Sequence, residues 1–213
     1  MKISVYIDGF NLYYGRLKKT QYKWLDLYKM CTLLFLNDEI ISIKYFTAAI
    51  KVRTEQDQIK TIRQQIYWRA LRTLSKVDII EGIFLQHKVF MKSVKDNSYV
   101  RVFKSEEKGT DVNIASHLVN DAHNKVFEKA IVISNDSDLV TPIRIVTTEL
   151  DIPVITVSPF DKNNLQLKSV SSGVKQIRKG LLCVSQFNHT VNDEIGEFVI
   201  PEDWKGDINV NSS

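Results

Sequence analysis

Short apolar runs alternate with longer stretches of helical periodicity along most of the chain. The apolar runs are rich in β-branched and aromatic residues and predict five strands, near residues 3–7, 40–50, 77–85, 131–133 and 153–157. Between them, apolar residues recur every three or four positions, which predicts helices. This alternation predicts an α/β fold of three layers, in which helices cover both faces of a mostly parallel sheet.

An extra β-hairpin is predicted over residues 86–104. A polar turn at residues 96–98 separates two alternating runs, residues 87–91 and 99–103. Lysine and arginine residues recur in this segment, so it is a candidate guide for an anionic substrate. An exposed sheet edge whose lysines prevent pairing with other strands explains the same charge.

The last part of the chain has weaker patterns. Residues 165–170 predict a short helix or a loop, and residues 177–187 predict a final strand or an extended segment. Residues 188–213 are acidic and are expected to be partly disordered. The simplest division is one domain over residues 1–187, followed by an acidic tail over residues 188–213.

The apolar pattern and the cysteines indicate where in the cell the protein is expected. The chain has 213 residues, and no apolar run approaches the roughly 18 residues of a membrane span. Cys31 and Cys183 lie in apolar surroundings, which is typical of reduced core cysteines. The first residues predict a strand and not a signal peptide, so we expect a cytoplasmic protein that has no membrane partner.

The charge is unevenly distributed. The whole chain carries a net charge of +4, but residues 188–213 hold six acidic residues against Lys205 alone, a net charge of −5. The remaining chain therefore carries +9. A basic body of this kind favours a polyanionic partner, nucleic acid first, although moderate positive charge also serves solubility alone.

Four acidic residues are the candidates for chemistry. Asp8 and Asp136 each follow a predicted inner strand, Asp138 lies two residues further on, and Asp111 lies near the start of a predicted helix. Because the carboxyl ends of parallel strands meet at one edge of the sheet, we expect the four carboxylates to converge there. Taken singly, each acidic residue could also be only a helix cap or a solvated loop residue.

Clustered carboxylates point to a metal centre. Three or four of them repel one another strongly, and bound cations relieve that repulsion. A site with oxygen ligands alone favours Mg²⁺ or Mn²⁺, and such a centre beside a basic surface suits the hydrolysis of a phosphodiester. Lys51 and Arg53 follow the second predicted strand and are candidates to bind the phosphates.

Three motifs in register carry a family resemblance. They are DGFNL at residues 8–12, KGTDV at 108–112 and SNDSD at 134–138. In this order and spacing they resemble the NYN domain family, PIN-like ribonucleases that include the LabA-like bacterial proteins. The resemblance covers roughly residues 1–160. Asn135 departs from the pattern, because the family usually has glycine there.

The resemblance implies a PIN-like sheet of order 3-2-1-4-5 and metal-dependent cleavage of RNA, single-stranded or structured. It implies metal ligation and catalysis by Asp8, Asp111, Asp136 and Asp138. The matches to Asn11, Lys108 and Ser134 would support the site or position the substrate.

Other functions fit some of the same sequence features. An acidic residue after an early strand with a later Asp-x-Asp also resembles Toprim-type sites and nucleotide-sugar transferases, but neither explains the motif at residues 108–112. A non-catalytic module of the same fold that binds RNA or a protein is the main alternative function. The RNA that is cut, the number of metal ions and the formation of a homodimer stay open.

Overall fold

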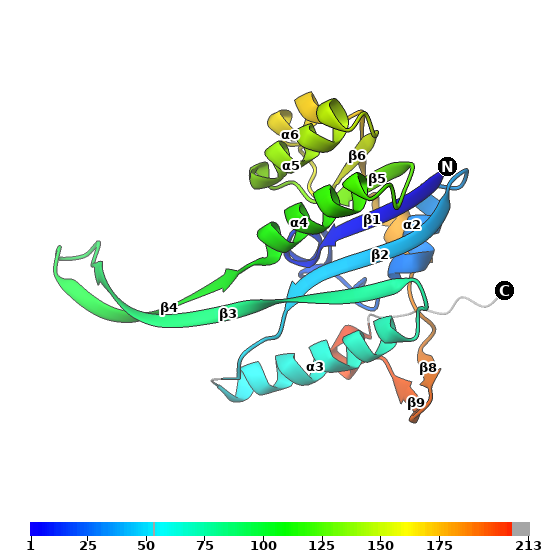
Figure 1. Ribbon diagram of the computed structural model, residues 1–213. Coiled ribbons are helices and arrows are strands. Elements are labelled where there is room, and N and C mark those ends of the chain that lie inside the picture. Colours follow the sequence, from blue (N-terminus) through cyan, green and yellow to red (C-terminus); the bar gives the residue numbers. More distant parts are fainter. Residues whose placement is uncertain (53, 206–213) are drawn as a thin grey trace.

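The computed structural model describes residues 1–52 and 54–205, and for residues 84–87 and 104–108 it describes the backbone alone. A seven-stranded sheet forms the centre of the molecule (Figure 1). Its strands lie side by side in the order β4 (Tyr99–Lys108), β3 (Val77–Lys92), β2 (Glu39–Ala48), β1 (Lys2–Asp8), β5 (Lys129–Ile133), β6 (Val154–Ser158) and β7 (Gly173–Gln176). Neighbouring strands are parallel except for the antiparallel pair β3–β4.

The predicted fold class is confirmed. The five predicted strands occur in the predicted order, as β3-β2-β1-β5-β6, and the sheet is extended by β4 at one edge and β7 at the other. β1 lies at the centre, between β2 and β5, with Ile7 beside Ile133 and Asp8 beside Phe46. This register places the residues that follow β1 and β5 next to one another, at the carboxyl ends of both strands.

Helices cover both faces of the sheet. One face carries α1 (Gly9–Leu12), the π-helical turn η1 (Tyr13–Leu17), α2 (Leu27–Leu34), α3 (Glu55–Arg72) and α7 (Lys179–Val184). The other carries α4 (Thr110–His123), the 3-10 turn η2 (Ser137–Leu139), α5 (Val140–Arg144), the π-helical turn η3 (Ile145–Glu149) and α6 (Leu165–Val170). Because side chains alternate along β1, Val5 belongs to the first core and Tyr6 to the second.

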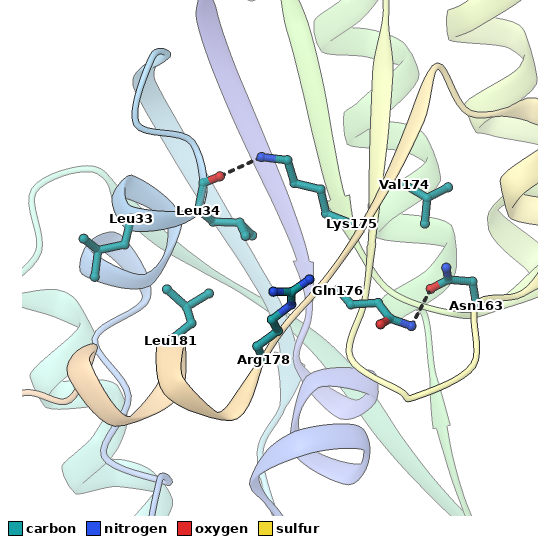
Figure 2. Close-up of a pocket in the computed structure, with 8 residues that line it drawn as sticks. All are labelled: Leu33, Leu34, Asn163, Val174, Lys175, Gln176, Arg178 and Leu181. Atoms are coloured by element: carbon teal, nitrogen blue, oxygen red, sulfur yellow. Dashed lines mark hydrogen bonds between the residues drawn. The ribbon is translucent and has the colours of Figure 1, made fainter.

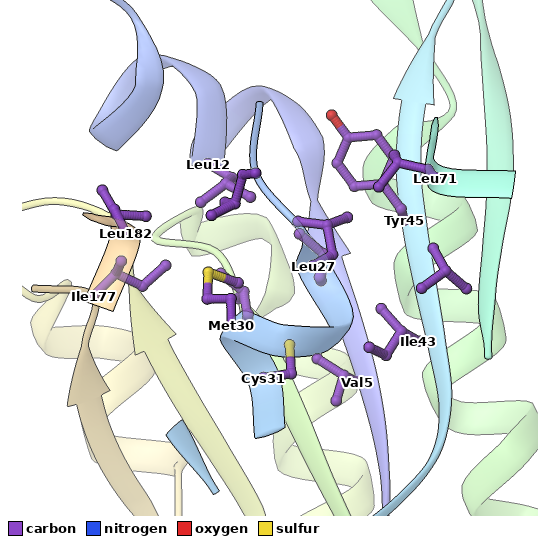
Figure 3. Close-up of a cluster of buried hydrophobic side chains, with 14 of the residues drawn as sticks. Val5, Leu12, Leu27, Met30, Cys31, Ile43, Tyr45, Leu71, Ile177 and Leu182 are labelled. Carbon is purple, nitrogen blue, oxygen red and sulfur yellow. The ribbon is translucent and has the colours of Figure 1, made fainter. Parts of the chain in front are cut away.

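The first core is the larger of the two buried clusters (Figure 3). Val5 and Ile43 of the sheet face Leu27 and Met30 of α2, while Leu182 of α7 closes the cluster. Two aliphatic layers packed in this way fix α2 against β1 and β2. The carboxyl end of β1 is therefore held rigidly in the middle of the fold.

The predicted hairpin is present, but its first arm is the direct continuation of the third strand. β3 runs without interruption from Val77 to Lys92, and β4 pairs with its outer part. Asn97 in the predicted turn has a φ of 59°, a left-handed conformation that asparagine tolerates well. Figure 1 shows the outer part of this ribbon standing well clear of the body.

The carboxyl-terminal third differs from expectation. The segment predicted as a final strand or extended chain, residues 177–187, contains α7, and the last strand of the sheet is β7, just before it. Residues 165–170 form α6, the helical one of the two predicted alternatives. The expected tail contains a hairpin of β8 (Thr190–Asp193) and β9 (Gly196–Val199), followed by the 3-10 turn η4 (Glu202–Trp204). The division into domain and tail itself stays a prediction.

The other expectations about burial are met in part. Cys31 is buried, whereas Cys183 is exposed on α7. Ile59 and Ile62, which recur at helical spacing in the first half of α3, are exposed, whereas the buried residues of that helix lie in its second half: Tyr67, Trp68, Ala70 and Leu71. Over residues 1–52 and 54–205, no helix is long and apolar enough to cross a membrane.

Candidate active site

Asp8 is the buried centre of the site. It is the last residue of β1 and caps the start of α1, with only 2% of its surface exposed. Its Oδ1 accepts a hydrogen bond from the backbone N–H of Asn11 at 2.9 Å, and its Oδ2 accepts one from the Asn11 side-chain amide at 2.6 Å. The carboxylate is therefore held in one orientation from the α1 side.

Ser134 joins the two central strands at the same point. It directly follows β5 and is buried. Its hydroxyl donates to Asp8 Oδ2 at 2.9 Å and accepts from the backbone N–H of Asp136 at 3.1 Å. One hydroxyl group therefore connects the two acidic residues that follow β1 and β5.

The electrostatics of Asp8 reflect this burial. Burial raises the pKa of Asp8 above its usual value, and the negative charge of Asp136 raises it further. The hydrogen bonds from Asn11 and Ser134 act in the opposite direction and favour the charged form. Asp8 and Asp136 thus form a like-charged pair whose repulsion a cation would relieve.

Asp136 and Asp138 occupy the start of the next helical segment. Asp136 is partly buried and caps η2, since its Oδ1 accepts from the backbone N–H of Asp138 at 3.0 Å. Asp138 is exposed. The capping function that the sequence left open for this stretch is therefore present, and it leaves Asp136 Oδ2 directed away from that cap bond.

Asn135 ties the site to the segment after β6 (Val154–Ser158). Its backbone N–H donates to Asn11 Oδ1 at 3.2 Å, while its own side-chain Oδ1 accepts from the backbone N–H of Asn164 at 2.8 Å. Ser158 donates to the same oxygen at 3.3 Å. The role of Asn164 was not predicted, and the sequence signal for it is an asparagine directly before the apolar periodic stretch of residues 165–170, where it caps α6.

The remaining predicted site residues lie around this centre. Asp111 is in the first turn of α4, as predicted, and Gly109 before it has a left-handed φ of 102°. Lys51 is exposed just beyond β2. Lys108 ends β4, but its side chain lies outside the described residues, and Arg53 lies outside them altogether.

The carboxylate oxygens at this site suit a divalent cation, although they do not surround a preformed metal site. Within the described part of the chain, no three histidine, cysteine, aspartate or glutamate side chains are grouped so that they could hold one metal ion. Mg²⁺ needs no such cage, because it commonly binds one or two carboxylates and completes its shell with water and substrate phosphate. The oxygen-only pair Asp8 and Asp136 fits that mode.

A separate cleft lies away from the acidic site formed around Asp8 and Asp136 (Figure 2). It has a volume of about 550 Å³ and is lined by residues of α2, the segment before α6, β7 and α7. Lys175 spans it and donates to the backbone carbonyl of Leu34 at 2.8 Å, while Gln176 donates to Asn163 Oδ1 at 3.3 Å. None of the predicted site residues lines this cleft.

The chain is similar to a solved structure, to a curated protein and to a family model. A crystal structure of a protein of unknown function, VPA0982 from Vibrio parahaemolyticus RIMD 2210633, has the same fold, with a TM-score of 0.57 and 17% identity over 84% of this chain and 93% of that one. Among curated proteins, 6-hydroxy-3-succinoylpyridine 3-monooxygenase HspA from Pseudomonas putida S16 is 26% identical over 97% of this chain and 76% of its own length. The model of the NYN domain matches residues 2–174. The chain therefore belongs to the NYN domain family.

Proposed function

We propose that this protein is a metal-dependent endoribonuclease that hydrolyses RNA phosphodiester bonds. The observation that carries the proposal is the network in which Asn11 and Ser134 hold Asp8 beside Asp136, at the carboxyl edge of the central strands of a NYN domain. Open α/β sheets place their sites at this edge.

Of the four acidic residues that the family resemblance implies as ligands, Asp8, Asp111, Asp136 and Asp138, the pair Asp8 and Asp136 would hold Mg²⁺ or Mn²⁺ directly. A divalent cation, when bound, makes water a stronger nucleophile and neutralises charge that develops on the phosphate. The cation also offsets the charge of Asp136 beside Asp8, so its binding favours the charged form of Asp8.

The neighbouring residues would position the acidic groups. Asn11 fixes Asp8 from the α1 side with two hydrogen bonds, and Ser134 fixes it from the β5 side. Because three donors hold one carboxylate, little reorientation is needed when substrate binds. Fixed carboxylates of this kind favour a defined geometry of attack on the phosphate.

Basic residues would bind the RNA backbone. Lys51 follows β2 and Lys108 ends β4, and both strand ends lie at the carboxyl edge of the central strands; Arg53, two residues after Lys51 in the sequence, is proposed for the same role. Lysine and arginine that contact phosphates displace counterions, so affinity would fall as salt concentration rises. An affinity that is flat from low to high salt would contradict this assignment.

The test is cleavage of labelled RNA with Mg²⁺, with Mn²⁺ and with EDTA. We expect product with either metal and none with EDTA. RNA binding without cleavage under all three conditions would favour the alternative function, a non-catalytic binding module of the same fold.

A second candidate function rests on the curated relative whose match spans 97% of this chain. That relative is named a 3-monooxygenase of 6-hydroxy-3-succinoylpyridine. The 550 Å³ cleft has apolar walls and two cations, Lys175 and Arg178, which suits a small aromatic acid. The test is consumption of added 6-hydroxy-3-succinoylpyridine under air with a two-electron reductant present. No consumption beyond that in the absence of the protein would exclude this candidate.

A further inference from the structure

The outer parts of β3 and β4 form an arm, defined here as residues 83–103, that stands clear of the body (Figure 1). β2 ends at Ala48, which pairs with Gly82, and beyond that point β3 has β4 as its strand partner. Strands rise about 3.3 Å per residue, so Lys92 lies roughly 33 Å beyond Gly82. A two-stranded ribbon is marginally stable alone, so a bound partner would stabilise it.

One face of the arm combines cations and aromatic rings in a regular pattern. Three cross-strand pairs lie on this face in successive rows, and each pair contains one cation and one ring: Lys88 with Phe103, Phe90 with Arg101, and Lys92 with Tyr99. The ring lies on alternate strands from row to row. We call this surface the cation–aromatic face.

The rings on this face are open to solvent. Phe90, Tyr99 and Phe103 are 69%, 71% and 64% exposed. The Lys88 ammonium lies 5.3 Å from the centre of the Phe103 ring, and the Arg101 guanidinium lies 5.9 Å from that of Phe90. Cation–π contacts at these distances hold each ring beside a positive charge while most of its surface stays open.

The opposite face of the arm has a different chemistry. Its outer rows pair Val89 with Val102 and Met91 with Val100, all of them aliphatic. The two faces suit different kinds of partner, because lysine is depleted in protein–protein interfaces and enriched where phosphates bind. An aliphatic face would suit a second protein surface, whereas the cation–aromatic face would not.

We propose that the cation–aromatic face binds single-stranded RNA, with bases stacked on the rings of Phe90, Tyr99 and Phe103 and phosphates held by Lys88, Lys92 and Arg101. Surfaces that bind single strands without strong sequence preference combine these two elements, a basic track and aromatic platforms. The proposal deepens the proposed nuclease function, on which its biological meaning rests.

The arm is placed to lead a strand to the acidic site. β3 is parallel to β1 through β2, so the arm leaves the sheet at the edge where Asp8 lies. β4 returns to Gly109 and the start of α4, next to Asp111. Asp8 is level with Ile80 through Phe46, and Lys88 lies eight residues past Ile80, about 26 Å along the arm. Stacked nucleotides repeat about every 3.4 Å, so a strand must extend roughly eight nucleotides to reach both places.

The test is RNA binding in EDTA, which prevents cleavage, measured by fluorescence anisotropy with single-stranded RNA of about 20 nucleotides and of about four. One variant replaces Phe90, Tyr99 and Phe103 with leucine, which keeps the surface apolar but removes the stacking platforms. The matched control replaces Val89, Met91 and Val100 on the opposite face with alanine. Circular dichroism confirms that each variant is folded.

We expect the leucine variant to bind the long RNA at least tenfold more weakly. The control should bind both as the natural protein does. Replacing Lys88, Lys92 and Arg101 with alanine should reduce the slope of log affinity against log salt by about 2, since each phosphate contact contributes about 0.7.

Three results would overturn the proposal. Unchanged binding of the long RNA by the leucine variant is the first, and an equal loss in the opposite-face control is the second. The third is a changed oligomeric state of the leucine variant in sedimentation with unchanged RNA affinity, which would assign the face to a second copy of the chain.

Two further outcomes test the nuclease function independently of the arm. If the leucine variant cleaves short RNA in Mg²⁺ at the rate of the natural protein, this result supports the nuclease function whether or not the arm binds RNA. Arm-dependent binding by the natural protein, with no cleavage in Mg²⁺, would support the arm and contradict the nuclease function.

Discussion

Ser134 donates its hydroxyl hydrogen to Oδ2 of Asp8 at 2.9 Å, across the junction between β1 and β5. The bond joins residues 126 positions apart in the sequence. It exists because β1 and β5 are parallel neighbours that end at the same level, with Ile7 beside Ile133. The two strands of the central sheet thereby fix one carboxylate.

Replacing Ser134 with alanine should reduce RNA cleavage about tenfold and destabilise the fold by about 1 kcal/mol. The reason is that Asp8 loses one donor and the backbone N–H of Asp136 loses its acceptor. Single-turnover kinetics and urea unfolding measure the two effects. Ser169→Ala, at an exposed position in α6, is the control and should change neither. Full activity in Ser134→Ala would show that this contact does not position Asp8.

Gly9→Ala should destabilise the protein by about 2 kcal/mol. A Cβ at this position would lie 2.6 Å from the Phe46 carbonyl oxygen and 2.8 Å from the Tyr45 ring, so the start of α1 would have to shift. Gly180→Ala in α7 is the matched control, because its Cβ would meet nothing within 4 Å and alanine favours a helix. Equal stability of the two variants in urea unfolding would contradict the close approach at Gly9.

Asp121→Ala should destabilise the fold by about 3 kcal/mol. Asp121, on α4, accepts from the Tyr6 hydroxyl at 2.7 Å and from the Lys44 ammonium, and all three groups are largely buried. Removing it leaves a charge without its counter-charge. Adding Lys44→Met to Asp121→Ala should recover part of the loss in urea unfolding, and a purely additive double variant would contradict the coupling.

Docking of the β8–β9 hairpin should depend on pH. Arg69 on α3 donates two hydrogen bonds to Asp193, at 2.6 and 2.7 Å, and lowers the pKa of that carboxyl to about 2. A lowered pKa means that the contact stabilises the folded state fully above the ordinary pKa near 4, and that this contribution is lost as pH falls toward 2.

The amide resonance of Gly196 reports this titration directly, because its N–H donates to Asp193 Oδ1 at 3.1 Å. The resonance should shift with a midpoint near 2, and in Asp193→Asn it should lose that transition. A midpoint near 4 would show that Arg69 does not hold Asp193 in solution.

The sequence predicts the frame of the site because strand ends are strongly marked. The runs before Asp8 and Asp136 are apolar and β-branched; Asp8 is the last residue of β1 and Asp136 lies three residues past β5, at the predicted strand ends. Asp111 lies at a helix start, also as predicted. Hydrophobic period and helix-capping preference are local properties, so they can be read from the residues themselves.

Other features depend on contacts that no local pattern contains. Asn135 is a departure from the family pattern, yet its side chain binds the segment before α6, which only the folded chain brings near. Residues 177–187 contain a short apolar run at positions 181–184, which periodicity cannot assign to strand or helix. Ile59 and Ile62 have the period of a buried stripe, but the residues of α3 that are buried all lie in the second half of the helix.

The most direct test of the nuclease function is single-turnover cleavage of end-labelled RNA by Asp136→Asn in Mg²⁺. Asparagine keeps the size and the capping ability of Asp136 but removes the charge that the cation would meet. Asp151→Asn, at an exposed position with a left-handed φ of 53° that asparagine also adopts, is the matched control. Both variants should be at least as stable as the natural protein in EDTA, since Asp136→Asn removes a repulsion with Asp8.

We expect the natural protein and Asp151→Asn to cleave RNA at the same rate, and Asp136→Asn to be slower by roughly a hundredfold or more, a loss of about 2.7 kcal/mol of transition-state stabilisation. Cleavage by Asp136→Asn at the natural rate, or equal cleavage by the natural protein in Mg²⁺ and in EDTA, would contradict a metal-dependent ribonuclease centred on Asp8 and Asp136.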